Sequence, residues 1–532
     1  MRIINLLLGL FLFSSMYAAE WQWSVKLKDY ISPETNASPE AYLWIPPNCN
    51  NIKAVMFGQH NMCEETIFEH PVFRQTMTEL GIAIVWLTPG IDQQWDVKKG
   101  SQKYFDTMMS DLAELSGYSE LNTVPVVPLG HSAMATFPWN FAAWNPERTL
   151  AVISYHGDAP RTNLTGYGGD NLEWGRTRNI DGIPGLMIEG EYEWWEARVN
   201  PALAFRMMYP QSTISFLCDA GHGHFDVSDA VVDYMCLFLK KAVQYRLSGS
   251  EHGMKSIDIT EGWLADRWYS DGKQRASASQ YINYGGDPHD AFWYFDEETA
   301  METEKYYARS SGKKYQYIGL KRNGKLLPFY KDSHSQYHLN FEPLTDGLNF
   351  HISATFTDSL RQHMTTDHSP KEKIQIDRIN GPVKKVNDST FTVQFYRMGL
   401  DNPKRTGDIW LLAHHLGDEK YKSSVQQLNI KVPYPNTEGR IQQINFPELQ
   451  DINSRQKTVK LDATADSKLP VSYYVKVGPV ELVGNELIIG NIPPKAKYPL
   501  AVTVVAWQYG STAGEKVQTA KAVERTFYIN ND

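Results

Sequence analysis

The sequence is short of the features that mark three large classes of protein. Lysine and arginine number 52 against 61 aspartates and glutamates, a net charge of −9, so no basic field exists to hold nucleic acid or an anionic membrane. Beyond residue 25, no apolar run has the roughly 18–20 residues that a membrane-spanning helix needs. Charged residues make up 21% and aromatic residues 12% of the chain, which argues against disorder. We therefore expect a globular protein with no nucleic-acid partner and no membrane insertion.

Cysteine is also scarce, with four residues at positions 49, 63, 218 and 236. A disulfide between Cys218 and Cys236 would close the shorter loop in an oxidising compartment. A core of this size needs no such link, however, so we expect four buried small hydrophobic residues. No Cys-x-x-Cys or Cys-x-x-His spacing indicates zinc.

The first residues have the pattern of a secretory signal. Arg2 gives a positive start, Leu6–Phe13 form a short apolar run, and Ala18-Ala19 offer a cleavage point. We expect residues 1–19 to be removed and the protein to be exported to the periplasm or the outside of the cell. No cysteine lies near the cut, so we do not expect a lipoprotein.

Residues 50–247 alternate short β-rich runs with helical patterns, which predicts an α/β domain over 20–247 whose mostly parallel sheet is covered on both faces. The expected strands are Lys53–Gly58, Ile82–Thr88, Val124–Gly130, Leu150–Tyr155, Gly185–Glu189 and Thr213–Cys218. A linker-like stretch follows at 248–253, and strand patterns then dominate. We predict a β-rich middle domain over 248–436 and an immunoglobulin-like β-sandwich over 437–532.

The segment Gly130-His131-Ser132-Ala133 carries the chemistry. It follows a β-run and precedes a helical pattern, which is the context of a nucleophile elbow, where a serine sits on a tight strand-to-helix turn. The residues two before and two after the serine must be small. Gly130 meets this need, whereas Met134-Ala135 replaces the commoner final glycine.

An elbow serine needs a base that is oriented by an acid, in the chain order Ser, acid, His. Glu193 lies in the turn after the expected strand 185–189 and is our choice of acid, over Glu191 and Glu189. After the last strand, Gly-His-Phe-Asp favours His224 as the base, over His222.

Two neighbouring groups leave alternatives open. His222, Asp226 and Asp229 could instead form a metal cluster, but this pattern is common in solvated loops, so we predict neither metal nor cofactor. The oxyanion hole should combine the N–H of Ala133 with a second N–H from the loop 58–62, where Asn61 or His60 should supply it.

The substrate cleft should draw on residues after the acid and on the segment before it. Trp194 and Trp195 follow the acid directly, and Tyr167 and Arg176 lie between two expected strands. Exposed aromatic rings suit sugar faces and arginine suits a carboxylate, although the two tryptophans could equally pack the following helix.

Ser132, Glu193 and His224, with the elbow around them, resemble the α/β-hydrolase superfamily over residues 45–247. The signal sequence, the β-rich domains and the loop Gly58–Met62 also look like exported Bacteroidetes esterases that act on plant polysaccharides. Among these, the chain is similar to the α/β-hydrolase-type pectin methylesterases. The resemblance implies a secreted serine esterase on a pectic polysaccharide, with a methyl ester favoured over an acetyl ester. The alternatives are an inactive carbohydrate-binding scaffold and a secreted serine peptidase.

Overall fold

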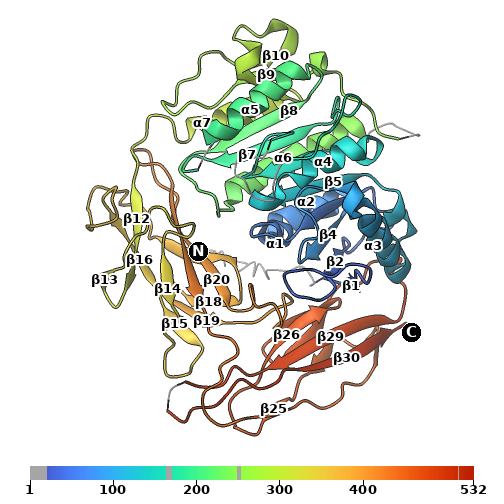
Figure 1. Cartoon of the computed structure of the whole chain (residues 1–532), viewed down its shortest axis with the longest axis vertical. Coiled ribbons are helices and arrows are strands. Elements are labelled where there is room, and N and C mark those ends of the chain that lie inside the picture. Colours follow the sequence, from blue (N-terminus) through green and yellow to red (C-terminus); the bar gives the residue numbers. More distant parts are fainter. Residues whose placement is uncertain (1–20, 163–170, 194, 248–252, 513, 532) are drawn as a thin grey trace, which may run out of the picture.

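The computed structural model describes residues 21–162, 171–193, 195–247, 253–512 and 514–531. An eight-stranded sheet forms the centre of the first domain, in the order β1-β2-β4-β3-β5-β6-β7-β8 (Figure 1). Its strands are β1 (Trp23–Lys26), β2 (Glu40–Trp44), β3 (Ala54–Gln59), β4 (Ile82–Thr88), β5 (Val126–His131), β6 (Val152–Tyr155), β7 (Gly185–Gly190) and β8 (Ile214–Asp219). Strand β2 is antiparallel to both of its neighbours, and the strands from β3 to β8 are parallel. The predicted mostly parallel sheet is confirmed.

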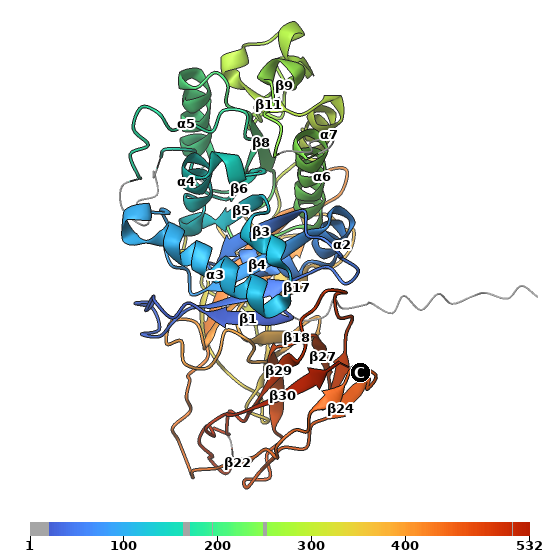
Figure 2. The same cartoon turned by 90° about the vertical axis from the view of Figure 1, so that its right-hand side faces the viewer.

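Helices cover both faces of this sheet. Every residue of β3 to β8 is buried, and the corresponding sequence is a continuous apolar run rather than an alternating one. The helices are α1 (Glu64–Glu69), α2 (Pro71–Leu80), α3 (Ser101–Ser116), α4 (Phe137–Trp144), α5 (Trp195–Met208) and α6 (Asp229–Arg246). Figure 2 shows α3, α4 and α5 on one side of the sheet and α2 and α6 on the other. The side chain of Ser228 caps α6 by accepting a hydrogen bond from Val231 N.

The predicted end of the α/β domain at residue 247 is too early. The next elements are β9 (Trp263–Asp266), β10 (Ser279–Gln280), β11 (Ala291–Tyr294) and α7 (Glu297–Ala308). Ser215 Oγ on β8 donates to the Trp293 carbonyl at 2.6 Å, and Tyr294 Oη donates to the Phe216 carbonyl at 2.7 Å. Both aromatic residues are 1% exposed and share one apolar core with the main sheet. The edge strand β8 is thus covered by residues that were predicted from the sequence to lie in the middle domain.

A β-rich middle domain follows, with an apolar core mostly its own. Its strands are β12 (Tyr317–Arg322), β13 (Lys325–Leu326), β14 (His338–Asn340), β15 (Asn349–His351), β16 (Ser353–Thr357), β17 (Gln375–Asn380), β18 (Val383–Asn387), β19 (Thr390–Val393), β20 (Asp408–His415) and β21 (Ser424–Lys431). They form one four-stranded and two three-stranded sheets.

The last domain is built on two sheets that contribute to one apolar cluster, as a sandwich requires. The larger sheet contains β23 (Ile452–Asn453), β30 (Val523–Asn530), β29 (Leu500–Trp507) and β26 (Ser472–Val477). The smaller contains β24 (Thr458–Lys460), β28 (Glu486–Ile489) and β27 (Val480–Val483), while β22 (Ile444–Asn445) pairs with β25 (Thr464–Ala465). The same cluster continues into the α3 side of the first domain.

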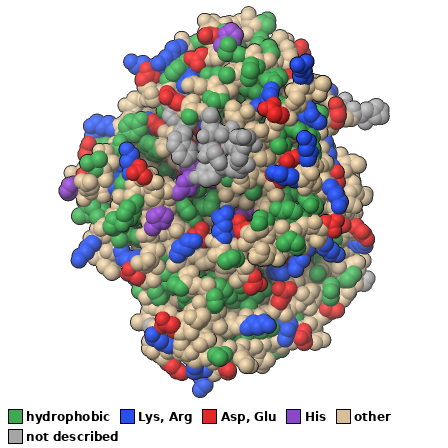
Figure 3. Space-filling view, viewed as in Figure 1, with side chains coloured by type: hydrophobic (Ala, Val, Ile, Leu, Met, Phe, Trp, Pro, Cys, Tyr) green, Lys and Arg blue, Asp and Glu red, His purple; other side chains and the backbone are tan. Residues whose placement is uncertain are grey.

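Three features of the composition can be followed in the structure. All four cysteines are free and buried, as predicted. Within the described parts of the chain, no helix is both long and apolar enough to cross a membrane. Figure 3 shows positive and negative side chains interspersed over the visible face, in agreement with the small net charge.

Candidate active site

The elbow is built as the sequence predicts. Strand β5 ends at His131, and Ser132 opens a single 3₁₀ turn over 132–134 before α4. Ser132 has φ of 55°, in the left-handed region that few non-glycine residues adopt. A Cβ on Gly130 would lie 1.9 Å from the carbonyl oxygen of Met134, so only glycine fits there. The turn therefore presents the serine at the carboxyl end of the sheet.

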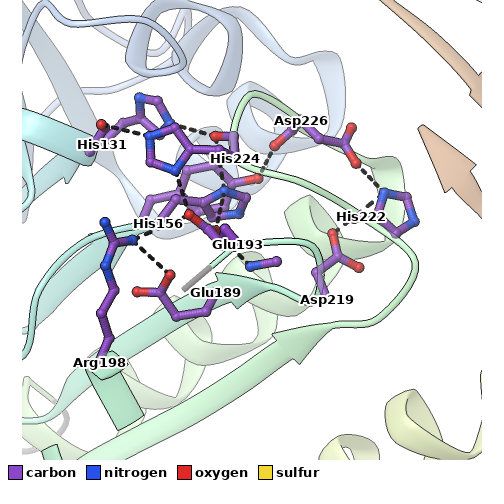
Figure 4. A network of polar contacts seen from close by, with 12 residues as sticks. His131, His156, Glu189, Glu193, Arg198, Asp219, His222, His224 and Asp226 are labelled. Atoms are coloured by element: carbon purple, nitrogen blue, oxygen red, sulfur yellow. Dashed lines mark hydrogen bonds and ion pairs between the residues drawn. The ribbon is translucent and has the colours of Figure 1, made fainter. Parts of the chain in front are cut away.

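Ser132, His224 and Glu193 meet at this edge, and Figure 4 shows His224 beside Glu193. His224 Nε2 lies 2.7 Å from Ser132 Oγ, and His224 Nδ1 contacts Glu193 Oε2. Glu193 follows β7 and His224 follows β8, so parallel strands bring together residues that are far apart in sequence. The predicted trio has the geometry of a nucleophile, a base and an orienting acid.

The acid is held in its ionised form. Glu193 is almost fully buried, yet it accepts hydrogen bonds from Gly190 N at 2.8 Å and from Arg198 Nη1 at 3.3 Å. Burial opposes its charge, but the contacts with His156, His224 and Arg198 outweigh burial and hold the pKa of the carboxyl well below its usual range. Burial lowers the pKa of His156 to about 4, so this imidazole is neutral, and its Nδ1 lies 3.0 Å from Glu193 Oε1.

The competing acids have other partners. Glu191 accepts from Gly221 N at 2.7 Å and pairs with Lys422 at 2.8 Å. Glu189 pairs with Arg198 at 2.9 Å. Geometry therefore favours Glu193 over both.

The competing base is also committed elsewhere. His222 Nδ1 contacts Asp226 and lies 3.8 Å from Asp219. The cluster with Asp229 that we considered does not form, because Asp229 bonds His70 at 3.1 Å instead and Asp219 stands in its place. His224 is thus the histidine that contacts Ser132.

The predicted second oxyanion donor is not available in this structure. The N–H of Asn61 donates to Glu64 Oε2 at 2.9 Å, and that of His60 donates to the Leu87 carbonyl at 2.8 Å. Within the described residues, the N–H of Ala133 has no acceptor, as an oxyanion donor requires. The expectation for the loop 58–62 fails because a buried carboxylate at the start of α1 accepts from Asn61 N, while the backbone of β4 accepts from His60 N.

Glu64 is a site residue that sequence reasoning missed. It is fully buried, burial raises its pKa to about 7, and its second oxygen accepts from His131 N at 2.9 Å. The side chain of Asn61 donates to the His131 carbonyl at 2.9 Å, so both backbone groups beside Ser132 are fixed by this loop. An acidic residue in the first turn of a helix was the available signal, but such residues are common there.

The middle domain contacts three of the loops around the site. Asn380 Nδ2 donates to the Met62 carbonyl at 3.0 Å beside Asn61, and Lys422 holds Glu191 beside the acid. The ring of His334 lies 5.8 Å from the ring of His224. The catalytic edge of the sheet is therefore enclosed by two domains, which domain-by-domain sequence reading did not indicate.

The predicted cleft residues remain largely untested. Arg176 lies on an exposed turn, and no contact joins it to the described site residues. Tyr167 and Trp194 lie outside the described residues, as does the side chain of Trp195 at the start of α5. Their roles in substrate binding stay predictions.

The strand order, the serine after β5, the acid after β7 and the histidine after β8 are the arrangement of the α/β-hydrolase fold. The chain has this fold, followed by β-rich accessory domains. No family model matches the sequence, and no curated protein matches it.

Three solved structures are similar to part of this chain. An S-formylglutathione hydrolase from Staphylococcus aureus is 12% identical, with a TM-score of 0.29, over 42% of this chain and 97% of that one. Est1E from Butyrivibrio proteoclasticus is 17% identical, with a TM-score of 0.28, over 42% and 99%. A CE1 ferulic acid esterase from the anaerobic fungus Anaeromyces mucronatus is 15% identical, with a TM-score of 0.29, over 40% and 87%. At such low identities and TM-scores, these similarities carry no argument about the activity of this chain.

Proposed function

We propose that this protein is a serine-dependent carboxylic ester hydrolase that acts on a carbohydrate. The observation that carries the proposal is the continuous contact from Ser132 through His224 to an ionised Glu193. Ser132 Oγ attacks the ester carbonyl carbon while His224 Nε2 accepts its proton. The C–O bond to the alcohol then breaks, and the alcohol leaves with that proton. Water, deprotonated by His224, releases the acid and restores the serine.

The finer proposal is an exported enzyme that acts on a pectic polysaccharide, with a methyl ester favoured over an acetyl ester. Its support is the signal-like N-terminus, the two β-rich domains and the resemblance of the elbow region to exported polysaccharide esterases. In a methyl uronate, the sugar carboxylate is the acyl group and methanol is the product. An acetyl ester would instead need a small apolar acyl pocket.

Labelling with a fluorophosphonate tests the reaction class. The wild-type protein should be labelled at Ser132, and Ser132→Ala should lose both labelling and turnover, by about 10⁴-fold or more, with an unchanged melting temperature. An unlabelled wild-type protein would support an inactive scaffold, and retained turnover in the variant would remove the mechanism.

Product analysis then separates the substrates. Methylated and acetylated pectins should be compared for methanol and acetate release, with a peptide panel as control. Methanol release in excess of acetate supports the finer proposal. Acetate alone would make the enzyme an acetylesterase, and peptide cleavage without either product would favour the peptidase.

A further inference from the structure

A strip of tyrosines begins one residue from the catalytic acid and crosses to the middle domain. Tyr192 directly precedes Glu193 and is 39% exposed. Its ring lies 6.2 Å from that of Tyr315, which is 42% exposed, and Tyr315 lies parallel to Tyr317 at 6.4 Å. Figure 1 shows β12, which contains Tyr317, to the left of the main sheet. Aromatic surface of this kind next to a catalytic loop suits the apolar faces of sugar rings.

Arg361 lies over the end of this strip. Its guanidinium carbon is 4.4 Å from the ring centre of Tyr317 and 5.2 Å from that of Phe329. It is also near enough to Tyr192 to interact with it electrostatically. Nη1 donates to the Ser359 carbonyl at 2.8 Å, which leaves Nε and Nη2 without an acceptor among the described residues. A guanidinium with unused donors can hydrogen-bond a carboxylate, and Nη2 is the unused donor here that is not fully buried.

The carboxylate closest to Arg361 in sequence is already used. Asp358 accepts hydrogen bonds from Gln362 N at 2.9 Å and from His363 Nδ1 at 2.9 Å. Burial lowers the pKa of Arg361, as expected of a cation that gains little from its surroundings. Asp358 attracts the guanidinium from a distance, but no described carboxylate forms an ion pair or a hydrogen bond with it, so a carboxylate on a ligand would stabilise this partly buried charge.

Other arginines of the middle domain differ from Arg361 in having a carboxylate partner. Arg322 pairs with Glu342 at 2.6 Å, Arg397 with Glu65 at 2.8 Å, and Arg405 with Glu34 at 3.6 Å. Among the described residues, Arg361 forms no such ion pair.

We propose that Arg361, with Tyr192 and Tyr317, forms a subsite that binds a carboxylate-bearing sugar next to the catalytic triad. The inference rests on the proposed esterase function for the reaction itself. It adds that the middle domain selects the substrate and that the preferred ester is flanked by a free uronate. The cation that we had sought at Arg176 would then come from a residue more than two hundred positions past the serine. Arginine suits this role because its planar fork matches a carboxylate, whereas lysine offers a single point charge.

The test compares two esters in the full-length protein. One is an oligogalacturonide that is partly methyl-esterified, and the other is p-nitrophenyl acetate, which has no carboxylate. Arg361→Met keeps the stem over the aromatic rings but removes the charge. Its kcat/KM should fall about 30-fold or more on the oligogalacturonide, mostly through KM, and stay within about two-fold on the small ester. Arg361→Lys should fall between these values.

Arg322→Met is the matched control, because it removes an arginine of the same domain that already has an anion. It should leave both rates within about two-fold of wild type. Equal loss on both esters by Arg361→Met, or no loss on either, would overturn the subsite. Loss by Arg322→Met to the same degree on the oligogalacturonide would also overturn it. A wild-type protein that hydrolyses neither ester would instead overturn the proposed function. Melting temperatures of the three variants identify any that fail to fold. In that case, the test is the binding of unesterified oligogalacturonide to Ser132→Ala, with and without Arg361→Lys. Equal affinity of the two proteins would overturn the subsite.

Discussion

Two histidines on the loop after β8, His222 and His224, lie two residues apart and both contact a carboxylate through Nδ1. His224 contacts Glu193, and its other ring nitrogen is 2.7 Å from Ser132. His222 contacts Asp226, and Asp219 lies close by at 3.8 Å. A carboxylate partner therefore does not identify a catalytic histidine. The partner of the second nitrogen distinguishes the two, because in His224 it is the hydroxyl of Ser132, the nucleophile that we propose.

The electrostatic surroundings of His222 and His224 also differ. Burial opposes the charge of His222, but Asp219 and Asp226 together outweigh it and raise its pKa to about 9. His222 is thus a fixed cation near neutral pH. Glu193, in contrast, shares its charge among His224, the neutral His156 and Arg198. The first arrangement holds a loop in place, and the second keeps a base ready to accept a proton.

The largest expected effect on kcat is the difference between substituting His224 and substituting His222. His224→Ala should reduce kcat about 10⁶-fold, because the base and its proton transfer are lost. His222→Asn should cost no more than about tenfold per folded molecule, because the loop loses only a brace. Steady-state rates on p-nitrophenyl acetate measure both, and a larger loss in His222→Asn would reverse the assignment.

The two glutamates of the acid loop sharpen the comparison further. Glu193→Gln should lower kcat about 10⁴-fold, because the amide no longer stabilises the imidazolium. Glu191→Gln should instead lower the free energy of unfolding by about 3 kcal/mol, because it breaks a buried pair with Lys422. Turnover rates and chemical denaturation of both variants distinguish these outcomes. Slow turnover in a Glu191→Gln variant of normal stability would show that Glu191, and not Glu193, is the acid of the triad.

The smallest effect concerns pH and stability. The pKa of His222 is raised from 6.5 in the unfolded chain to about 9 in the folded one, so the folded state binds the extra proton between these values. Its contribution, on the order of 3 kcal/mol, is complete below pH 6.5 and is lost as the pH rises through 9. Denaturation at pH 6 and pH 9.5 should show this loss in wild type and much less of it in His222→Asn. An equal pH dependence in the two proteins would contradict the ion pair.

Site residues whose positions depend on strand order could be predicted from the sequence. Roles that depend on contacts between residues far apart in the chain could not. Ser132, Glu193 and His224 could be found because each follows a recognisable strand and the fold sets their order. The N–H of Asn61 could not be assigned correctly, because its bond to Glu64 depends on how the loop folds back on α1. Arg361 carried no signal, since its isolation from any carboxylate is a property of the packed domain.

The edge strand β8 has a practical consequence for anyone who wishes to shorten this protein. A gene fragment ending at residue 247 would keep all three triad residues but would strip Trp293 and Tyr294 from their places against Ser215 and Phe216. Such a truncation would expose the flank of the strand that leads to His224. An independently expressed minimal protein should therefore retain at least the chain as far as residue 308, and recovery of the middle domain's contacts requires more.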